Sequence, residues 1–87
     1  MGININGQKT MAFYDHTTIY PVKVPLGCHA LAIVNPSETS ITFTVTTQFG
    51  DTLTSVVPPS SSYDGLFNTI DTVNIIGSLE FYVELRV

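Results

Sequence analysis

The residues of this chain that could carry chemistry are few and scattered. Two histidines, one cysteine and seven carboxylates stand among 87 residues. Cys28 and His29 come closest to a nucleophile beside a base. Because they are adjacent in a segment whose pattern predicts a strand, their side chains point to opposite faces and cannot form a thiolate–imidazole pair. We interpret Cys28 as a small buried side chain and His29 as an inward-facing or edge residue.

Asp15 and His16 form a second pair, in a segment that reads as a loop. Two possible metal ligands without a third at a fixed spacing do not define a site, and a turn-forming role for Asp15 is favoured. The sequence contains no phosphate-binding loop, no dinucleotide fingerprint and no nucleophile elbow. We therefore expect no catalytic residues, no metal and no cofactor, and a protein that is not an enzyme.

The low content of charged residues limits the classes of partner that the chain can bind. Charged residues make up 11% of the sequence, against about 25% in ordinary soluble domains. The formal net charge is −4, and the only basic residues are Lys9, Lys23 and Arg86. Nucleic acid is not expected as a partner, because binding it relies on counterion release by Lys and Arg. A membrane is not expected either, since basic residues are scarce and no apolar run approaches about 18 residues.

The N-terminal segment 1–7 has neither a basic start nor an apolar stretch. Asn6 also stands where a myristoylation signal requires Ser or Thr. If Met1 is the native start, we expect synthesis in a cytosol and no secretion by a signal peptide. The single cysteine agrees, because it cannot form an intramolecular disulfide.

Strand patterns cover most of the chain. Seven segments alternate apolar and polar side chains or are rich in β-branched residues: 9–14, 17–26, 28–34, 40–47, 52–57, 70–76 and 79–87. No long stretch has the 3.6-residue period of a helix, and no linker divides the chain. The sequence predicts an all-β fold in a single domain, 1–87: an antiparallel β-sandwich, jelly-roll or Ig-like, of about seven short strands.

Some strands can be placed further. Segment 28–34 is apolar on nearly both faces, which predicts a central strand. Pro21 and Pro25 remove ladder donors from segment 17–26, which predicts an edge or bulged strand.

Turn residues predict how the strands connect. Segments 35–38 and 49–51 each read as a turn between antiparallel neighbours, and segment 77–78 as a tight turn into the last strand. Segment 58–68 is the longest irregular stretch and the expected crossover between sheets. Its two apolar residues, Leu66 and Phe67, are expected to plug one end of the sandwich.

The Thr- and Ser-rich strands and the C-terminal half carry a resemblance. Segment 41–47, the run 56–60 leading through Phe67 to Ile70, and the closing strand 79–87 resemble the small β-sandwich proteins of tailed-phage virions, the capsid decoration or head-fibre type. The resemblance implies a structural protein made in the host cytoplasm and located in the virion. It would sit on a protein lattice such as a capsid, often as a homotrimer, and stabilise the shell by bridging subunits. No residue role transfers position by position.

A candidate interface follows from this interpretation. A surface covered by Ser, Thr and Asn is easy to desolvate against another protein, although a merely solvated Thr-rich sheet is the alternative. Strand edges are normally guarded by lysines, which are nearly absent here, so a partner is expected to cover them. The candidate residues lie on the polar faces of segments 40–47 and 79–87 and in segment 58–68: Thr42, Thr44, Thr46, Tyr63, Phe67 and Tyr82.

Three other functions stay open on the sequence. A carbohydrate- or cell-surface-binding module is the main alternative; four tyrosines could serve as platforms, although the chain has no tryptophan. A small regulatory or toxin-like protein is another. An ice-binding array of Thr42, Thr44 and Thr46 would need more rows than the chain provides, and cross-strand threonine pairing explains them better.

Overall fold

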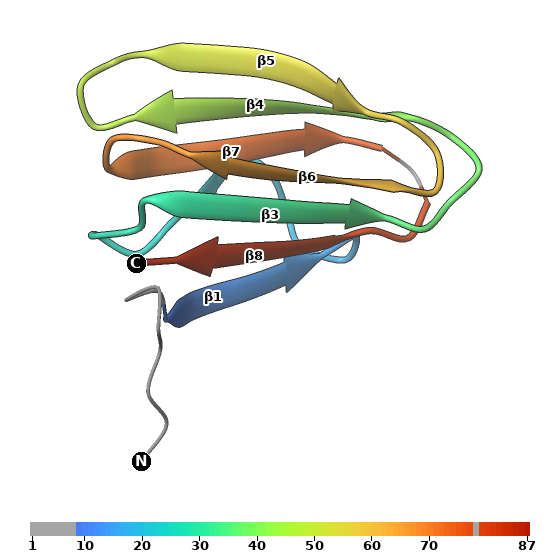
Figure 1. Ribbon diagram of the computed structural model, residues 1–87, viewed down its shortest axis with the longest axis horizontal. Helices are drawn as coiled ribbons and strands as arrows, with labels where there is room; N and C mark the ends of the chain where they lie inside the picture. Colours follow the sequence, from blue (N-terminus) through green and yellow to red (C-terminus); the bar gives the residue numbers. More distant parts are fainter. Residues whose placement is uncertain (1–8, 78) are drawn as a thin grey trace.

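The computed structural model describes residues 9–77 and 79–87, which form eight strands and no helix. In chain order these are β1 (Thr10–Asp15), β2 (Val22–Lys23), β3 (Ala30–Asn35), β4 (Ile41–Thr47), β5 (Thr52–Val57), β6 (Ser61–Leu66), β7 (Ile70–Ile76) and β8 (Tyr82–Arg86). They make two four-stranded antiparallel sheets, β1-β8-β3-β6 and β2-β7-β4-β5, packed together (Figure 1). The predicted all-β sandwich is confirmed.

The strand order identifies the kind of sandwich. β1 pairs with β8, β2 with β7, β3 with β6 and β4 with β5. The chain is thus a long hairpin rolled up so that successive pairs fall in alternate sheets. Eight strands in this order make a jelly roll, and the Ig-like alternative does not apply.

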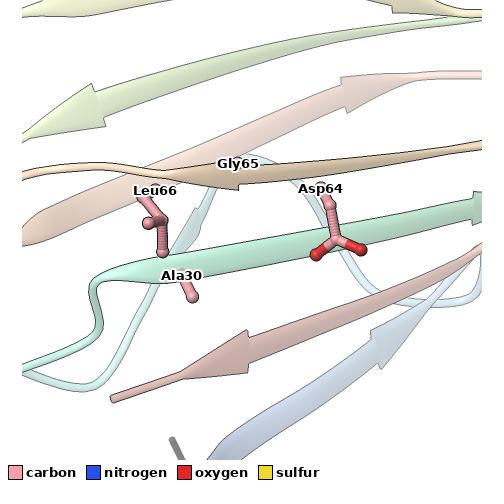
Figure 2. Close-up of a pocket in the computed structure, with 4 residues that line it drawn as sticks. All are labelled: Ala30, Asp64, Gly65 and Leu66. Atoms are coloured by element: carbon pink, nitrogen blue, oxygen red, sulfur yellow. The ribbon is translucent and has the colours of Figure 1, made fainter. Parts of the chain in front are cut away.

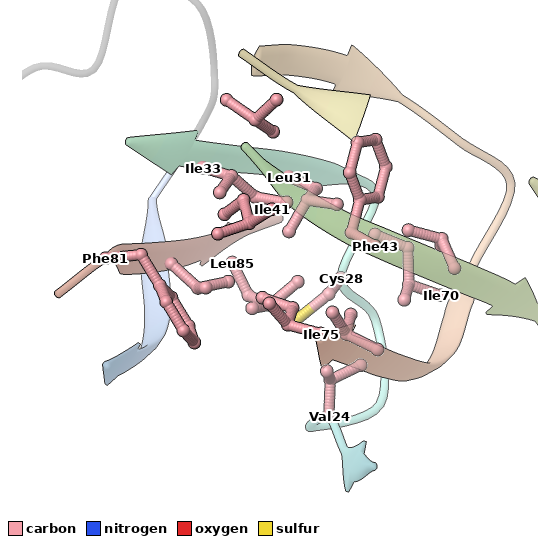
Figure 3. Packing of buried hydrophobic residues seen from close by; sticks show 14 residues of the cluster. Val24, Cys28, Leu31, Ile33, Ile41, Phe43, Ile70, Ile75, Phe81 and Leu85 are labelled. Carbon is pink, nitrogen blue, oxygen red and sulfur yellow. The ribbon is translucent and has the colours of Figure 1, made fainter. Parts of the chain in front are cut away.

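The core is built by alternation along the strands. In β4, Ile41, Phe43 and Val45 are buried while the intervening threonines face outward, and β8 alternates in the same way. Inward residues from both sheets interdigitate around Cys28, as Figure 3 shows. The fully buried hydrophobic side chains include Leu31, Ile33, Ile41, Phe43, Val45, Val57, Ile70, Val73, Phe81, Val83 and Leu85.

The sequence predicted about seven strands, and the structure has eight. The missing strand, β6, lies inside segment 58–68, which was expected to be irregular. Its sequence, SSYDGL, has little apolar alternation because β6 is an edge strand. The expected crossover is confirmed, since the chain passes here from the sheet of β5 to the sheet of β6.

Of the three predicted turns between neighbours, one is confirmed. Segment 49–51 joins β4 to β5, which pair antiparallel. The prediction for segment 35–38 is wrong, because β3 and β4 lie in opposite sheets. The same correction applies to the connection after Gly77, since β7 and β8 lie in opposite sheets; Ser78 itself is outside the described residues. Turn residues reverse the chain locally but do not specify whether it stays in one sheet.

The positions of β3, of segment 17–26 and of the pair Leu66 and Phe67 were also predicted from the sequence. The central position of β3, between β8 and β6, is confirmed. Segment 17–26 is at an edge as predicted, but pairs only over Val22–Lys23. Phe67 packs against the core as expected, whereas Leu66 is 76% exposed and does not plug the sandwich. The predictions made for segment 1–7 concern residues that lie outside the described part of the chain.

Asn35 ties two crossings between the sheets to the end of β3. Its side chain is fully buried. The amide nitrogen donates to the carbonyl of Thr39 at 2.8 Å and to those of Val57 and Pro58 at 3.1 Å, while Oδ1 accepts from the backbone and hydroxyl of Ser37. One side chain thus joins the β3–β4 connection, through Thr39, to the end of β5 and the start of the β5–β6 connection, through Val57 and Pro58.

We expect Asn35→Ala to lower the free energy of unfolding by about 3 kcal/mol, because it removes a fully buried amide together with its five hydrogen bonds and leaves a cavity. Chemical denaturation followed by circular dichroism measures this. Ser37→Ala is the matched control: it removes one partner of Asn35 at a partly exposed site and is expected to cost about 1 kcal/mol or less. Equal losses for the two variants would contradict the role given to Asn35.

Candidate interaction surface

The outer face of the sheet β2-β7-β4-β5 presents three rows of side chains. The register across β5, β4 and β7 aligns Val56, Thr42 and Ile76 in one row, Thr54, Thr44 and Asn74 in the next, and Thr52, Thr46 and Thr72 in the third. We call these nine residues the threonine face. None of them is charged. The hydroxyls of Thr44 and Thr54 lie 3.0 Å apart, which is the cross-strand threonine pairing expected from the sequence.

The predicted positions of Thr42, Thr44 and Thr46 agree with this face, since all three point away from the core. Sequence reasoning missed the apolar corner of the face, formed by Val56 and Ile76. Val56 is 51% exposed and Ile76 is 69% exposed. The period-two pattern of β5 and β7 places both on the outer side, but only the register shows that they are neighbours.

Tyr63 and Phe67 are not part of an exposed interface. Tyr63 lies opposite Ile33 and turns inward, with its ring centroid 4.6 Å from that of Phe43. Gly65 makes room for it: a methyl group there would lie 2.8 Å from ring atoms of Tyr63. Phe67 is half-buried against the core. These two aromatic residues in a polar segment serve the interior, because β6 pairs with β3 and faces the other sheet.

Tyr82 lies on the outer face of the other sheet, between Asp15 and Val34. The six candidate residues therefore divide into three on the threonine face, one on the opposite face and two at the core. They do not form one continuous surface.

The outer face of the sheet β1-β8-β3-β6 contains a trough along β3. Ala30 lies between Arg86 and Leu66, and Ala32 lies between Glu84 and Asp64, so small side chains are flanked by larger ones. A pocket of about 250 Å³ opens here, lined by Ala30, Asp64, Gly65 and Leu66 (Figure 2). We call this feature the alanine trough.

An ion pair stands beside the alanine trough. Arg86 Nη2 lies 2.8 Å from Glu84 Oε1, and the hydroxyl of Thr10 also donates to Glu84. The hydrogen bond from Arg86, supported by that from Thr10, lowers the pKa of Glu84 from its ordinary value. Glu84 in turn raises the pKa of Arg86. The face thus carries both charge signs at its centre, whereas the nine residues of the threonine face are uncharged and the nearest charge in their rows is Lys23, paired with Thr72 at the β2 edge.

Cys28, His29 and Asp15, the residues first considered for chemistry, do not form a reactive site. Cys28 is buried and His29 is exposed, so the two side chains lie on opposite sides as predicted, but the expectation of an inward-facing His29 is wrong. Both residues precede β3, and Cys28 joins Leu31 and Ile33 in the core. Burial raises the pKa of the Cys28 thiol, which disfavours the reactive thiolate. Asp15 accepts hydrogen bonds from the backbone and hydroxyl of Thr17, which is the turn role favoured for it.

Two kinds of feature are absent from residues 9–77 and 79–87. These residues contain no group of three or more His, Cys, Asp or Glu side chains that could hold a metal ion. They also include no helix with the length and apolar character needed to cross a membrane.

Comparison of the chain with protein-family models, with curated proteins and with solved structures finds no match.

We expect Glu84→Gln to destabilise the protein at neutral pH and to matter less in acid. Because the native pKa of Glu84 lies below the ordinary value of 4.5, the unfolded chain takes up this proton first as the pH falls. The contribution of Glu84 is complete above 4.5 and is lost as the pH falls through the native pKa. Thermal unfolding of both proteins from neutral pH down to about pH 2 measures it. A Tm difference that stays constant over this range would refute the assignment, with Glu38→Gln in the β3–β4 loop as the charge-matched control.

Proposed function

We propose that this protein is a non-enzymatic structural protein that docks on a protein lattice and stabilises it, as a capsid decoration (cement) or accessory protein of a tailed-phage virion. The observation that carries the proposal is the threonine face: nine aligned positions on three strands, without a charge and with an apolar corner.

The chemistry of the threonine face suits contact with another protein. Hydroxyls and methyl groups are less costly to desolvate than ammonium or carboxylate groups. The cores of protein interfaces are likewise depleted in charged residues. Val56 and Ile76 supply exposed apolar area at one end, and the threonines supply donors and acceptors over the rest.

The small size of the threonine face favours a partner that offers many identical binding sites. Nine small side chains on one domain give a modest contact, and a single contact of this kind would be weak. If the domain is itself multivalent, many weak contacts on one lattice add up to firm attachment, because each further contact is intramolecular. This is the reason for proposing a lattice rather than a single soluble partner.

The test is co-sedimentation with purified heads of the phage that encodes the chain. We expect saturable binding with a fixed number of copies per head, weakened at least about tenfold by Thr44→Lys, which places a charge at the centre of the face. Ser62→Lys adds the same charge on the outer face of the other sheet and should leave binding unchanged. Absence of binding by the unaltered protein, or equal effects of the two variants, would overturn the proposal.

A second candidate function has its own observation, the alanine trough. An exposed aromatic ring, Tyr82, pairs with Asp15 on the same sheet face, farther along β8 from the Glu84–Arg86 ion pair and the pocket at Ala30. Aromatic faces stack on sugar rings, and Arg and carboxylate groups hydrogen-bond their hydroxyls. The alternative is therefore a carbohydrate- or cell-surface-binding module that uses this face.

Glycan-array screening tests the alternative. If it holds, we expect binding of a defined glycan that is lost in Tyr82→Ala and kept in Thr44→Lys. The reverse pattern, or no glycan bound at millimolar-range affinity, would exclude it.

A further inference from the structure

The edges of the two sheets differ in how they are protected. A free edge exposes unpaired N–H and C=O groups and is normally blunted by short length, bulges, proline or charge. β1 has a bulge between Thr10 and Ala12 and ends at a charged residue. β2 pairs over two residues and includes Lys23. β6 carries Asp64 at its middle.

β5 has none of these devices. It runs for six residues, TLTSVV, at the outer edge of its sheet (Figure 1). It contains no charge, no proline and no glycine, and its pairing with β4 is regular. Leu53 is 40% exposed and Val56 is 51% exposed. Within the described residues this is the one edge open to regular pairing with another strand.

The hairpin shows which backbone groups of β5 are free. The N–H of Thr47 donates to the carbonyl of Asp51 at 2.9 Å, so this pair is of the hydrogen-bonded kind. Hydrogen-bonded and non-hydrogen-bonded pairs alternate along an antiparallel ladder. Thr52, Thr54 and Val56 therefore belong to non-hydrogen-bonded pairs with β4, and their N–H and C=O groups point away from it.

We propose that β5 pairs antiparallel with β5 of a second copy of this chain, about a two-fold axis that passes beside Thr54. In this register Thr54 lies opposite Thr54 of the second copy, and Thr52 lies opposite Val56. All the free groups of these three residues are then satisfied reciprocally, as an isologous contact requires.

Two antiparallel copies of β5 can pair in this register without a missing donor and without a meeting of like charges. Moving the pairing one step in one direction would place Thr52 opposite Pro58, which has no N–H to donate. One step in the other direction would place Val56 opposite Gly50, which lies outside β5 in the β4–β5 turn. In the proposed register Leu53 is covered beside Ser55 of the second copy. No charged residues meet, because the two Asp51 carboxylates fall at opposite ends of the paired strands. They are about 20 Å apart, well beyond the Debye length of about 8 Å.

The pairing joins two threonine faces into one. A two-fold axis perpendicular to the sheet keeps outward side chains on the same side, so two four-stranded sheets become one of eight strands. Formation of the β5 dimer does not depend on lattice docking. The two-fold dimer replaces the trimer implied by the resemblance and would also supply the multivalency that lattice binding favours.

Mass in solution tests the dimer. We expect light scattering at micromolar concentration to give twice the mass of one chain. Thr54→Lys places two ammonium groups opposite each other at the axis and should weaken dimerisation at least about tenfold. Thr44→Lys is the matched control: it lies on the same face, one strand in from the edge, and should stay dimeric. A monomer or a trimer for the unaltered chain, or equal effects of the two lysines, would overturn the inference.

Crosslinking tests the register separately. A Thr54→Cys variant treated with a short bismaleimide should give a covalent dimer. Thr44→Cys should not, because the two copies of that position are three strand spacings apart, about 14 Å. Crosslinking only at position 44 would exclude this edge. The outcome is distinct from that of the lattice assay, since Thr44→Lys is expected to weaken docking on heads while leaving the dimer intact.

Discussion

The fold depends on holding the chain together where it passes from one sheet to the other. Six of the seven connections between strands make such a crossing, and only β4 and β5 form a hairpin within one sheet. Crossing segments leave the ladders, so their polar backbone groups need other partners. At the end of β3, the buried amide of Asn35 donates to Thr39 and Pro58 in two such segments and to Val57 at the end of β5.

The two residues before β3 also hold crossing segments in place, through backbone hydrogen bonds. The carbonyl of Cys28 accepts from Ile70, the carbonyl of His29 accepts from Phe67, and the N–H of His29 donates to Arg86, each at 2.8 Å. The β6–β7 crossing and the end of β8 are thereby fixed to the residues that precede β3. Cys28 and His29, the residues that looked most like a reactive pair, hold the topology through main-chain atoms, and that use requires no special reactivity.

Those aspects of the fold that follow from local period were predictable from the sequence. Alternation in β4 and β8 gave the buried and exposed residues of these two strands correctly. Cys28 and His29 precede β3 and do not follow its period, because Cys28 lies in the core with Leu31 and Ile33 while His29 is exposed. β6 was missed because an edge strand with one inward aromatic ring, Tyr63, has no clear alternation. The same turn residues serve a hairpin at 49–51 and a crossing at 35–38, so sheet membership could not be deduced from them.

The candidate site was predictable only along single strands. Thr42, Thr44 and Thr46 were placed correctly because they share one strand. Their neighbours on β5 and β7 are set by register, which depends on contacts distant in the sequence. Tyr63 was misplaced for the same reason, since its orientation follows from the pairing of β6 with β3.

Charged side chains are distributed unevenly between the outer faces of the two sheets. Asp64, Glu84 and Arg86 lie on the outer face of one sheet, and Lys23 and Asp71 lie 3.6 Å apart near the β2 edge of the other. The outward side of an antiparallel sheet does not contribute to the core, so Lys or Glu would be tolerated there and would favour solubility. Cross-strand pairing accounts for threonine at Thr44 and Thr54, but folding does not require that all nine positions on β5, β4 and β7 lack charge, nor that the edge beside them is unguarded. Both features reduce the cost of removing water from one side of the molecule, which is a requirement of contact with another protein surface.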